Sequence, residues 1–375
     1  MHDDTPRTGS IHGEAVTTMG RRRFMDTLRS LGFGALSASF LTADDVQAAS
    51  RDEVPVVYGF GRNDEGELEP HRKTVPADWY DDFRGAIAAH RRLDVFDHDG
   101  VANSAVEPGE YAGKNAAIRV EVTDDEAHGA LPEEIDHVPV EVRRVDASDR
   151  HDAPGDSPGS PPVLAKGLPG GVGIASDELY GTLAPALRNP SDGVLYFATS
   201  NHVFEGDRTR GDSLYVTAKS GKQAIGTVHE GFPRSDVVCV RPANGYWPLH
   251  SIRNGTDIDV RGQFTKAGLA DLKAAGKRLE KVGMRSGHST GKIQAIDGVT
   301  CAYGAICKRG QLKWGRESDF TDGDSGSVNY APDPESPEDG VLVGGLNNAR
   351  TWWPGENYIW GTAGYRITEQ HGYTF

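Results

Sequence analysis

Short strand-like segments recur through the C-terminal half of the chain and limit what it can fold into. Each holds a few apolar residues and ends at glycine, asparagine, aspartate or proline: GVLYFAT, DSLYVTA, AIGTVHE, DVVCVRP, DIDVRG, GKIQAI, TCAYGAI, SVNYA, GVLVGGL and NYIWGTAGYRI. Many short strands with regular turn signals are typical of an all-β barrel or a pair of sandwiches. The exception is 269–283, an amphipathic stretch that predicts a surface helix. We therefore expect residues 171–375 to form one mainly β domain.

A smaller unit precedes it at 50–146. WYDDFRGAIAAHRRL has helical apolar spacing, and AAIRVEVTDD and VPVEVRRV alternate as strands do, which predicts a small α+β module. The module is either a propeptide or a permanent domain. It shows no pairing of a nucleophile with a base, and four of its histidines are expected to be surface or packing residues: His90, His98, His128 and His137. Residues 147–170 are rich in Pro, Gly, Ser and Asp and bury too little apolar surface to order themselves, so we assign them as a linker.

The N-terminal segment 1–49 has the features of an export signal. Three arginines at 21–23 precede Phe24 and Met25, an apolar run follows at 31–43, and VQAAS then offers a small-residue cleavage site. The run is too short for a lasting membrane span. The pattern resembles a twin-arginine signal and predicts a secreted or extracytoplasmic protein without a stable membrane span. The alternative is a basic amphipathic helix of the mature protein.

Charge and cysteine content exclude several classes. Asp and Glu number 55 against 40 Lys and Arg, giving a net charge of −15, which argues against a nucleic-acid partner. A solvated acidic surface, including one adapted to high salt, is favoured over a specific acidic binding patch. The three cysteines are neither a disulfide scaffold nor a zinc site, and we expect no metal and no cofactor. Cys301 and Cys307 are close enough to bridge a short loop, which would leave Cys239 as a buried apolar residue.

The segment FTDGDSGSVNY at 320–330 poses the question of whether Ser325 is a nucleophile. A nucleophilic serine needs a base, an orienting acid and backbone N–H donors for the developing oxyanion. In VLYFATSNHVF, an apolar strand ends and presents His202. In FPRSDVVCVRP, Asp236 begins a buried-looking strand, where a carboxylate is costly unless it is paired. An imidazole is a suitable partner, so these three residues form a candidate catalytic set.

The order His202, Asp236, Ser325 resembles that of the chymotrypsin/trypsin-like serine proteases. ATSNHV, with Thr199 three residues before the histidine, is similar to the family's T-x-x-H at a strand end. SDVVCV resembles its aspartate followed by an apolar strand, and GDSGS is similar to its G-D-S-G-G. KVGMRSGHSTGKI at 281–293 resembles a segment of the bacterial members.

The resemblance covers 171–375 and implies two six-stranded antiparallel β-barrels with the site between them, preceded here by the α+β module. It implies that Ser325 attacks a carbonyl, that His202 shuttles the proton and that Asp236 holds the histidine tautomer. The backbone N–H groups of Gly323 and Ser325 would form the oxyanion hole. The implied protein is a monomeric serine endopeptidase that hydrolyses protein or peptide substrates through an acyl-enzyme.

The same resemblance suggests a substrate pocket. In the trypsin branch, the residue six positions before the nucleophile lies at the base of the pocket for the side chain preceding the cut. Here that residue is Asp319, which would select Arg or Lys, and we expect Asn347 to line the pocket as well. A one-residue slip would place Ser318 or Phe320 there instead.

Other readings of the serine motif differ in function. A secreted binding or surface protein that keeps the fold without catalysis is the main alternative, and an esterase using the same three residues is another. An α/β-hydrolase elbow is excluded because Ser327 occupies its final glycine position and only His371 lies downstream. A calcium loop starting at Asp322 is excluded because Gly326 and Ser327 stand where other residue types are needed.

Overall fold

The computed structural model describes residues 52–63, 66, 68–93, 99–113, 115–145, 165–204, 210–301, 306–353 and 356–375. The segment 1–49, most of the linker 147–170 and His98 lie outside these ranges. Within the described ranges, no helix is both long and apolar enough to cross a membrane.

The first described region contains two helices and six strands. They are β1 Glu53–Arg62, β2 Leu68–Pro76, α3 Ala77–Arg92, β3 Val101–Glu107, β4 Ala117–Val122, α4 Asp125–Ala130, β5 Glu134–Ile135 and β6 Val138–Arg144. Helix α3 buries Trp79, Phe83 and Ile87, because a spacing of three or four residues places them on one face. Its His90 is also buried, with the ring Nε2 2.8 Å from the Ser104 hydroxyl, whereas His128 and His137 are exposed.

The second region is a seven-stranded sheet with the order β10-β11-β14-β13-β12-β8-β9. Its elements, with the β7 strand before it, are β7 Gly167–Gly170, β8 Gly173–Ala175, β9 Tyr180–Thr182, β10 Leu187–Arg188, β11 Leu195–Thr199, η3 Asn201–Phe204, β12 Ser213–Ala218, β13 Gly221–Phe232 and β14 Val237–Pro242. Three connecting elements follow: β15 Trp247–Asn254, β16 Thr256–Phe264 and α5 Lys266–Ala274.

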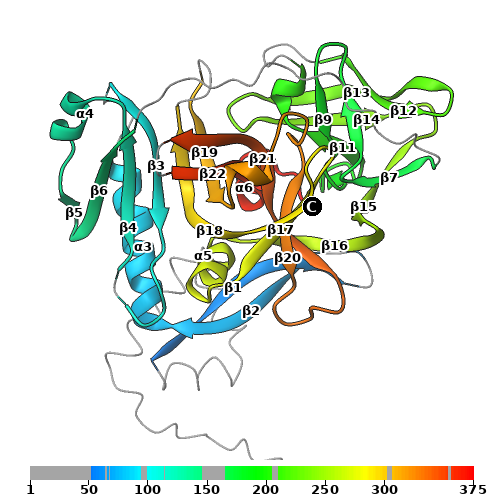
Figure 1. Ribbon diagram of the computed structural model, residues 1–375. Helices are drawn as coiled ribbons and strands as arrows, with labels where there is room; N and C mark the ends of the chain where they lie inside the picture. The colour runs from blue at the N-terminus through cyan, green and yellow to red at the C-terminus, as the bar shows by residue number, and fades with distance from the viewer. Residues whose placement is uncertain are drawn as a thin grey trace, which may run out of the picture.

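The third region closes on itself as a six-stranded antiparallel barrel. Its elements are β17 Arg278–Gly283, β18 Gly287–Thr300, β19 Lys308–Trp314, η4 Glu317–Asp319, β20 Val328–Pro332, β21 Val341–Trp353, β22 Glu356–Ala363 and the C-terminal helix α6 Gly364–His371. Hydrogen bonding runs β17-β18-β19-β22-β21-β20 and back to β17. Figure 1 shows this barrel in yellow to red beside the green seven-stranded sheet.

One apolar cluster joins these two strand-rich regions. It contains Tyr196, Ala198 and Val237 from the sheet and Val343 and Leu346 from the barrel. The expected mainly β class with two β units is confirmed. One unit is the expected closed six-stranded barrel, and the other contains seven hydrogen-bonded strands.

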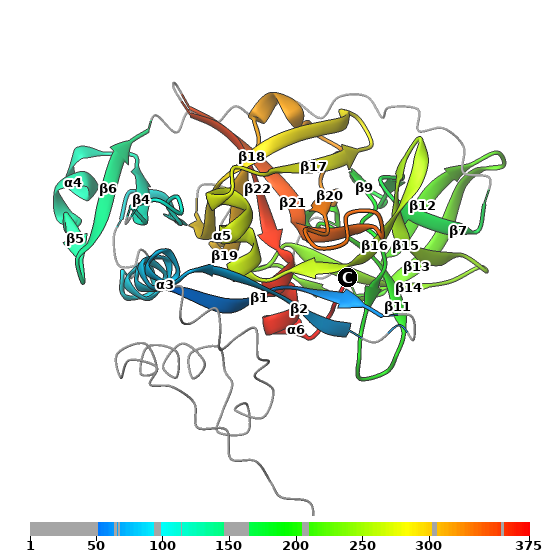
Figure 2. The same ribbon diagram turned by 90° about the horizontal axis from the view of Figure 1, so that it is seen from below.

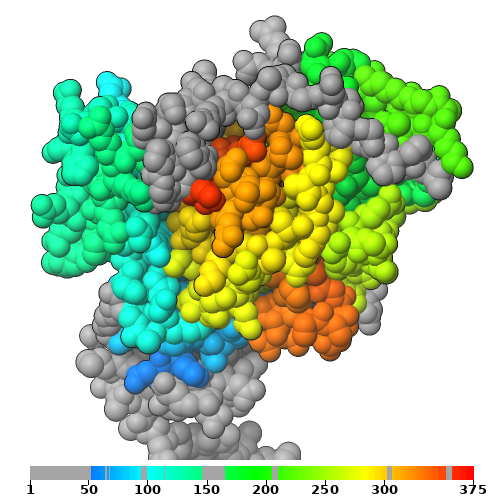
Figure 3. Space-filling view, in the orientation of Figure 1, coloured from blue at the N-terminus to red at the C-terminus, as the bar shows by residue number. Residues whose placement is uncertain are grey.

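The α+β module is continuous with the barrel sheet. Strand β1 pairs antiparallel with β16, and β3 pairs antiparallel with β18. Figure 2 shows β1 and β2 running beside β16, and Figure 3 shows the cyan module surface directly against the yellow barrel surface. A buried ion pair joins Lys313 Nζ of β19 to Glu121 Oε1 of β4 at 2.7 Å.

The helix expected at 269–283 is wrong in its second half. Helix α5 ends at Ala274, and β17 begins at Arg278. Gly276 adopts a φ of +66°, which ends the helix, and burial then alternates with a period of two through Leu279 and Lys281.

Two of the three cysteines are paired. Cys301 and Cys307 form a disulfide, and Cys239 is a buried free thiol. A disulfide in a chain with so few cysteines fits an oxidising compartment.

Candidate active site

His202 and Asp236 lie at the adjacent ends of two paired strands. Strand β11 pairs with β14, with Thr199 opposite Val238. His202 follows β11 in the short η3 helix, and Asp236 directly precedes β14. The His202 backbone N–H donates to Asp236 Oδ1 at 2.8 Å, and its ring Nδ1 lies 2.7 Å from Oδ2. The structure therefore brings these two predicted site residues into direct contact.

The electrostatics of this pair define the histidine tautomer. Burial alone would raise the pKa of the Asp236 carboxyl, but the His202 ring and the Lys308 ammonium outweigh it and hold that pKa well below its usual range. Because an ionised carboxylate only accepts hydrogen bonds, the neutral ring carries its proton on Nδ1, which leaves a lone pair on Nε2. The His202 side chain is 40% exposed and that of Asp236 3%, so the ring is open to a substrate while its partner is shielded.

Ser325 lies in a tight turn between η4 and β20. The Asp324 N–H donates to the Thr321 carbonyl at 2.9 Å and closes the turn. From β9, the Thr182 N–H donates to the Ser325 carbonyl at 2.8 Å, and its hydroxyl donates to the Gly323 carbonyl at 2.8 Å. A strand of the seven-stranded sheet thus holds a turn that belongs to the barrel.

The same turn packs against the strand end that carries His202. The Asn347 carbonyl accepts the Gly326 N–H at 2.9 Å and the Ser200 hydroxyl at 3.1 Å. A Cβ at Gly326 would lie only 3.0 Å from the Ser200 nitrogen. Ser325 and His202 are therefore each within two residues of this shared contact. Among the described residues, no direct hydrogen bond joins the Ser325 hydroxyl to the His202 ring.

Two backbone N–H groups of the turn are available for a ligand. Those of Asp324, Gly326 and Ser327 donate to carbonyl groups of the protein. Those of Gly323 and Ser325 have no acceptor within the described ranges. Gly323 has a φ of +98°, a conformation that a residue with a side chain adopts only under strain. A free N–H on the serine itself and another two residues before it are the donors that an oxyanion needs.

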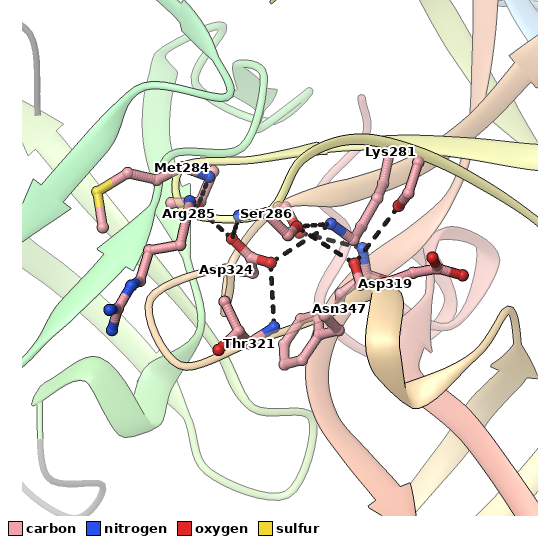
Figure 4. Close-up of polar contacts among 12 residues, drawn as sticks. Lys281, Met284, Arg285, Ser286, Asp319, Thr321, Asp324 and Asn347 are labelled. Atoms are coloured by element: carbon pink, nitrogen blue, oxygen red, sulfur yellow. Dashed lines mark hydrogen bonds and ion pairs between the residues drawn. The ribbon is translucent and has the colours of Figure 1, made fainter. Parts of the chain in front are cut away.

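A buried ion pair supports the turn that carries Ser325, as Figure 4 shows. Lys281 Nζ of β17 lies 3.4 Å from Asp324 Oδ2, and both side chains are 0% exposed. Asp324 Oδ1 accepts the backbone N–H groups of Arg285 and Ser286 at 2.9 and 3.2 Å, and Oδ2 accepts that of Thr321 at 3.1 Å. Asp324 therefore ties the turn that carries Ser325 to the β17–β18 hairpin.

Asp319 lies at the end of η4, beside this network. The other acidic side chains of the loop are paired: Arg350 contacts Glu317 at 3.3 Å and Asp322 at 3.8 Å, and Asp324 faces its lysine. Asp319 is half-buried and forms no ion pair with another described residue. Its carboxylate nevertheless acts electrostatically on Lys281, since it opposes the lowering of the Lys281 pKa by burial.

Asn347, which was expected to line the pocket, lies in the interior of the barrel on β21. Its side-chain oxygen accepts from Trp314 Nε1 and Asn329 Nδ2, both at 2.9 Å, and its nitrogen donates to the Ser327 hydroxyl at 3.2 Å. The residue is fully buried. Its polar atoms support the strands under the turn and leave nothing to contact a substrate.

Three residues of the site were missed from the sequence: Thr182, Lys281 and Lys308. Thr182 lies in a segment without any motif. Lys281 opens the segment that resembles bacterial proteases, but its helix-like surroundings suggested a solvated lysine. No group of metal-ligating side chains occurs in the part of the chain that the structure describes.

Comparisons with known proteins give a structural likeness alone. No family model and no curated protein matches the chain. Among solved structures, it is similar to a glutamic acid specific serine protease (19% identity, 55% of this chain and 99% of that chain, TM-score 0.43). It is also similar to Nocardiopsis protease (16%, 55% and 97%, TM-score 0.42) and to Thermobifida fusca protease A (17%, 55% and 97%, TM-score 0.42). These neighbours are chymotrypsin-like bacterial serine proteases. Because the identities and TM-scores are low, we base the proposed function on the geometry of the site.

Proposed function

We propose that this protein is an exported serine endopeptidase that hydrolyses peptide bonds through an acyl-enzyme. Two observations carry the proposal: the His202 ring binds Asp236, and the Asn347 carbonyl links the strand end before His202 to a turn in which the N–H groups of Gly323 and Ser325 are free. In this mechanism His202 Nε2 takes the Ser325 proton as Oγ attacks the carbonyl carbon. The N–H groups of Gly323 and Ser325 bind the resulting oxyanion, and His202 then protonates the leaving amine. The chemistry requires no cofactor.

Labelling with a fluorophosphonate probe tests the proposal, because the probe reacts with a serine that a base has activated. The full chain should be labelled at Ser325 and the Ser325→Ala variant should not. A folded wild-type protein that resists the probe would support the alternative, a secreted binding or surface protein. An esterase would also be labelled, so matched amide and ester substrates are compared. Turnover of the ester alone would replace the endopeptidase assignment.

We propose Asp319 as the specificity residue. It is the acidic residue of the loop before Ser325 that forms no ion pair among the described residues, and a basic side chain in the pocket would bind its carboxylate through a charge-assisted contact. Cleavage after Arg or Lys should exceed cleavage after Phe or Leu by about tenfold or more, and Asp319→Ala should remove this preference. A positional peptide library measures both. Equal rates after Phe, Leu, Arg and Lys in the wild type would exclude Asp319 from the pocket.

We further propose export through a twin-arginine signal, as arginines 21–23 and the apolar run after them suggest. Replacing the three arginines with lysines keeps the charge and should leave the protein in the cytoplasm. Fractionation followed by immunoblotting reports its location. Normal secretion of the lysine variant would reject this signal type.

A further inference from the structure

Lys308 contacts the acid of the site from the opposite β unit. It is the first residue of β19 in the barrel and directly follows Cys307 of the disulfide. Its Nζ lies 2.6 Å from Asp236 Oδ2, and its side chain is only 12% exposed. The same oxygen faces His202 Nδ1 at 2.7 Å. One carboxylate oxygen is therefore shared by the imidazole and an ammonium group.

This sharing changes the charge that His202 experiences. A carboxylate alone stabilises a protonated imidazole, because the two charges are opposite. When the Lys308 ammonium binds the same carboxylate, the Lys308–Asp236 pair has no net charge. A proton added to His202 then places a second positive charge beside the single negative charge of Asp236. The contact is shielded from water, so the effect is screened less than at the surface.

We propose that Lys308 is a positioning residue for the candidate triad: it binds Asp236, weakens the stabilisation of protonated His202 and keeps the base available at lower pH. The inference rests on the proposed function. It predicts that the acidic limb of the pH–activity profile is set partly by a lysine outside the triad.

No other charged group near Asp236 among the described residues accounts for the proposed effect on His202. His371 of α6 lies behind it, with Nε2 2.8 Å from the hydroxyl of the adjacent Ser235, which also donates to Gln370. Burial lowers the pKa of His371 to about 4, so this ring is neutral where a serine protease works. Among the described residues, the charged groups facing the Asp236 carboxylate are His202 of η3 and Lys308 of β19.

Four variants of the full chain separate charge from structure. Lys308→Met removes the charge and the donor, Lys308→Gln removes the charge but keeps a donor, and Lys308→Arg keeps both. Arg309→Met is the matched control, because it removes one positive charge from an exposed position one residue along the same strand. Lys308→Gln carries the test if Lys308→Met does not fold.

The second-order rate constant of fluorophosphonate labelling is measured from about pH 5 to pH 9. The acidic limb of this pH profile should shift to higher pH by about one unit in Lys308→Met and Lys308→Gln. The plateau should change by less than about fivefold, because the triad itself stays complete. Lys308→Arg and Arg309→Met should keep the wild-type limb.

Two results would overturn the inference. One is that folded Lys308→Met and Lys308→Gln keep the acidic limb of the wild-type pH profile, even if their plateau rate is lower. A lysine with a merely structural role would lower the labelling rate at every pH without moving the limb. The other is an equal shift in Lys308→Arg, which would show that charge is not responsible. An absence of wild-type labelling at every pH would instead overturn the proposed function itself.

Discussion

Ser325→Ala should lower kcat for peptide hydrolysis by about ten-thousand-fold or more, because the acyl-enzyme cannot form without the hydroxyl. The residue is 7% exposed and its backbone carbonyl, which the substitution keeps, makes its contact with Thr182. We therefore expect an unchanged free energy of unfolding within about 0.5 kcal/mol. Steady-state kinetics and urea denaturation measure the two quantities.

His202→Ala should give a similar loss, and the double variant should be no slower than either single variant, because members of a triad act as one unit. Independent, multiplicative losses would show that the two residues do not share a mechanism. Hydrolysis by Ser325→Ala within tenfold of the wild type would remove this serine as the nucleophile.

Lys281→Met should have the largest effect on stability, lowering the free energy of unfolding by about 3–5 kcal/mol. It leaves the fully buried Asp324 carboxylate without its counter-ion. Burial lowers the pKa of Lys281, and the facing Asp324 carboxylate opposes that shift. Each charge therefore stabilises the other in the interior. Labelling of Ser325 should also fall at least about a hundredfold, because Asp324 shapes the turn that presents the free N–H groups.

Lys277→Met is the control, since the same substitution at an exposed lysine four residues earlier should change stability by less than about 0.5 kcal/mol. Urea denaturation at neutral pH compares the two variants. Equal stability of Lys281→Met and the wild type would mean that Asp324 is held by its three backbone donors alone.

Local pattern in the sequence was sufficient for several features of this protein. The strand segments of the C-terminal region follow from apolar residues alternating between turn formers, and most of them appear as strands. The meeting of His202 with Asp236 was predictable because a carboxylate entering a buried strand requires a partner. Helical spacing likewise predicted α3 and its buried face.

Contacts between distant segments decided the rest. Lys281 was missed because an amphipathic pattern does not distinguish a solvated helical lysine from a buried one on a strand, and Gly276 determines which applies. Thr182 is 141 residues from the carbonyl that its hydroxyl binds, and Lys308 is 72 residues from Asp236. Pairing of β3 with β18, which continues the barrel sheet into the N-terminal module, is equally non-local. Sequence periodicity specifies which face of an element is buried, whereas only the closed barrel and its neighbouring sheet determine which side chains meet across that face.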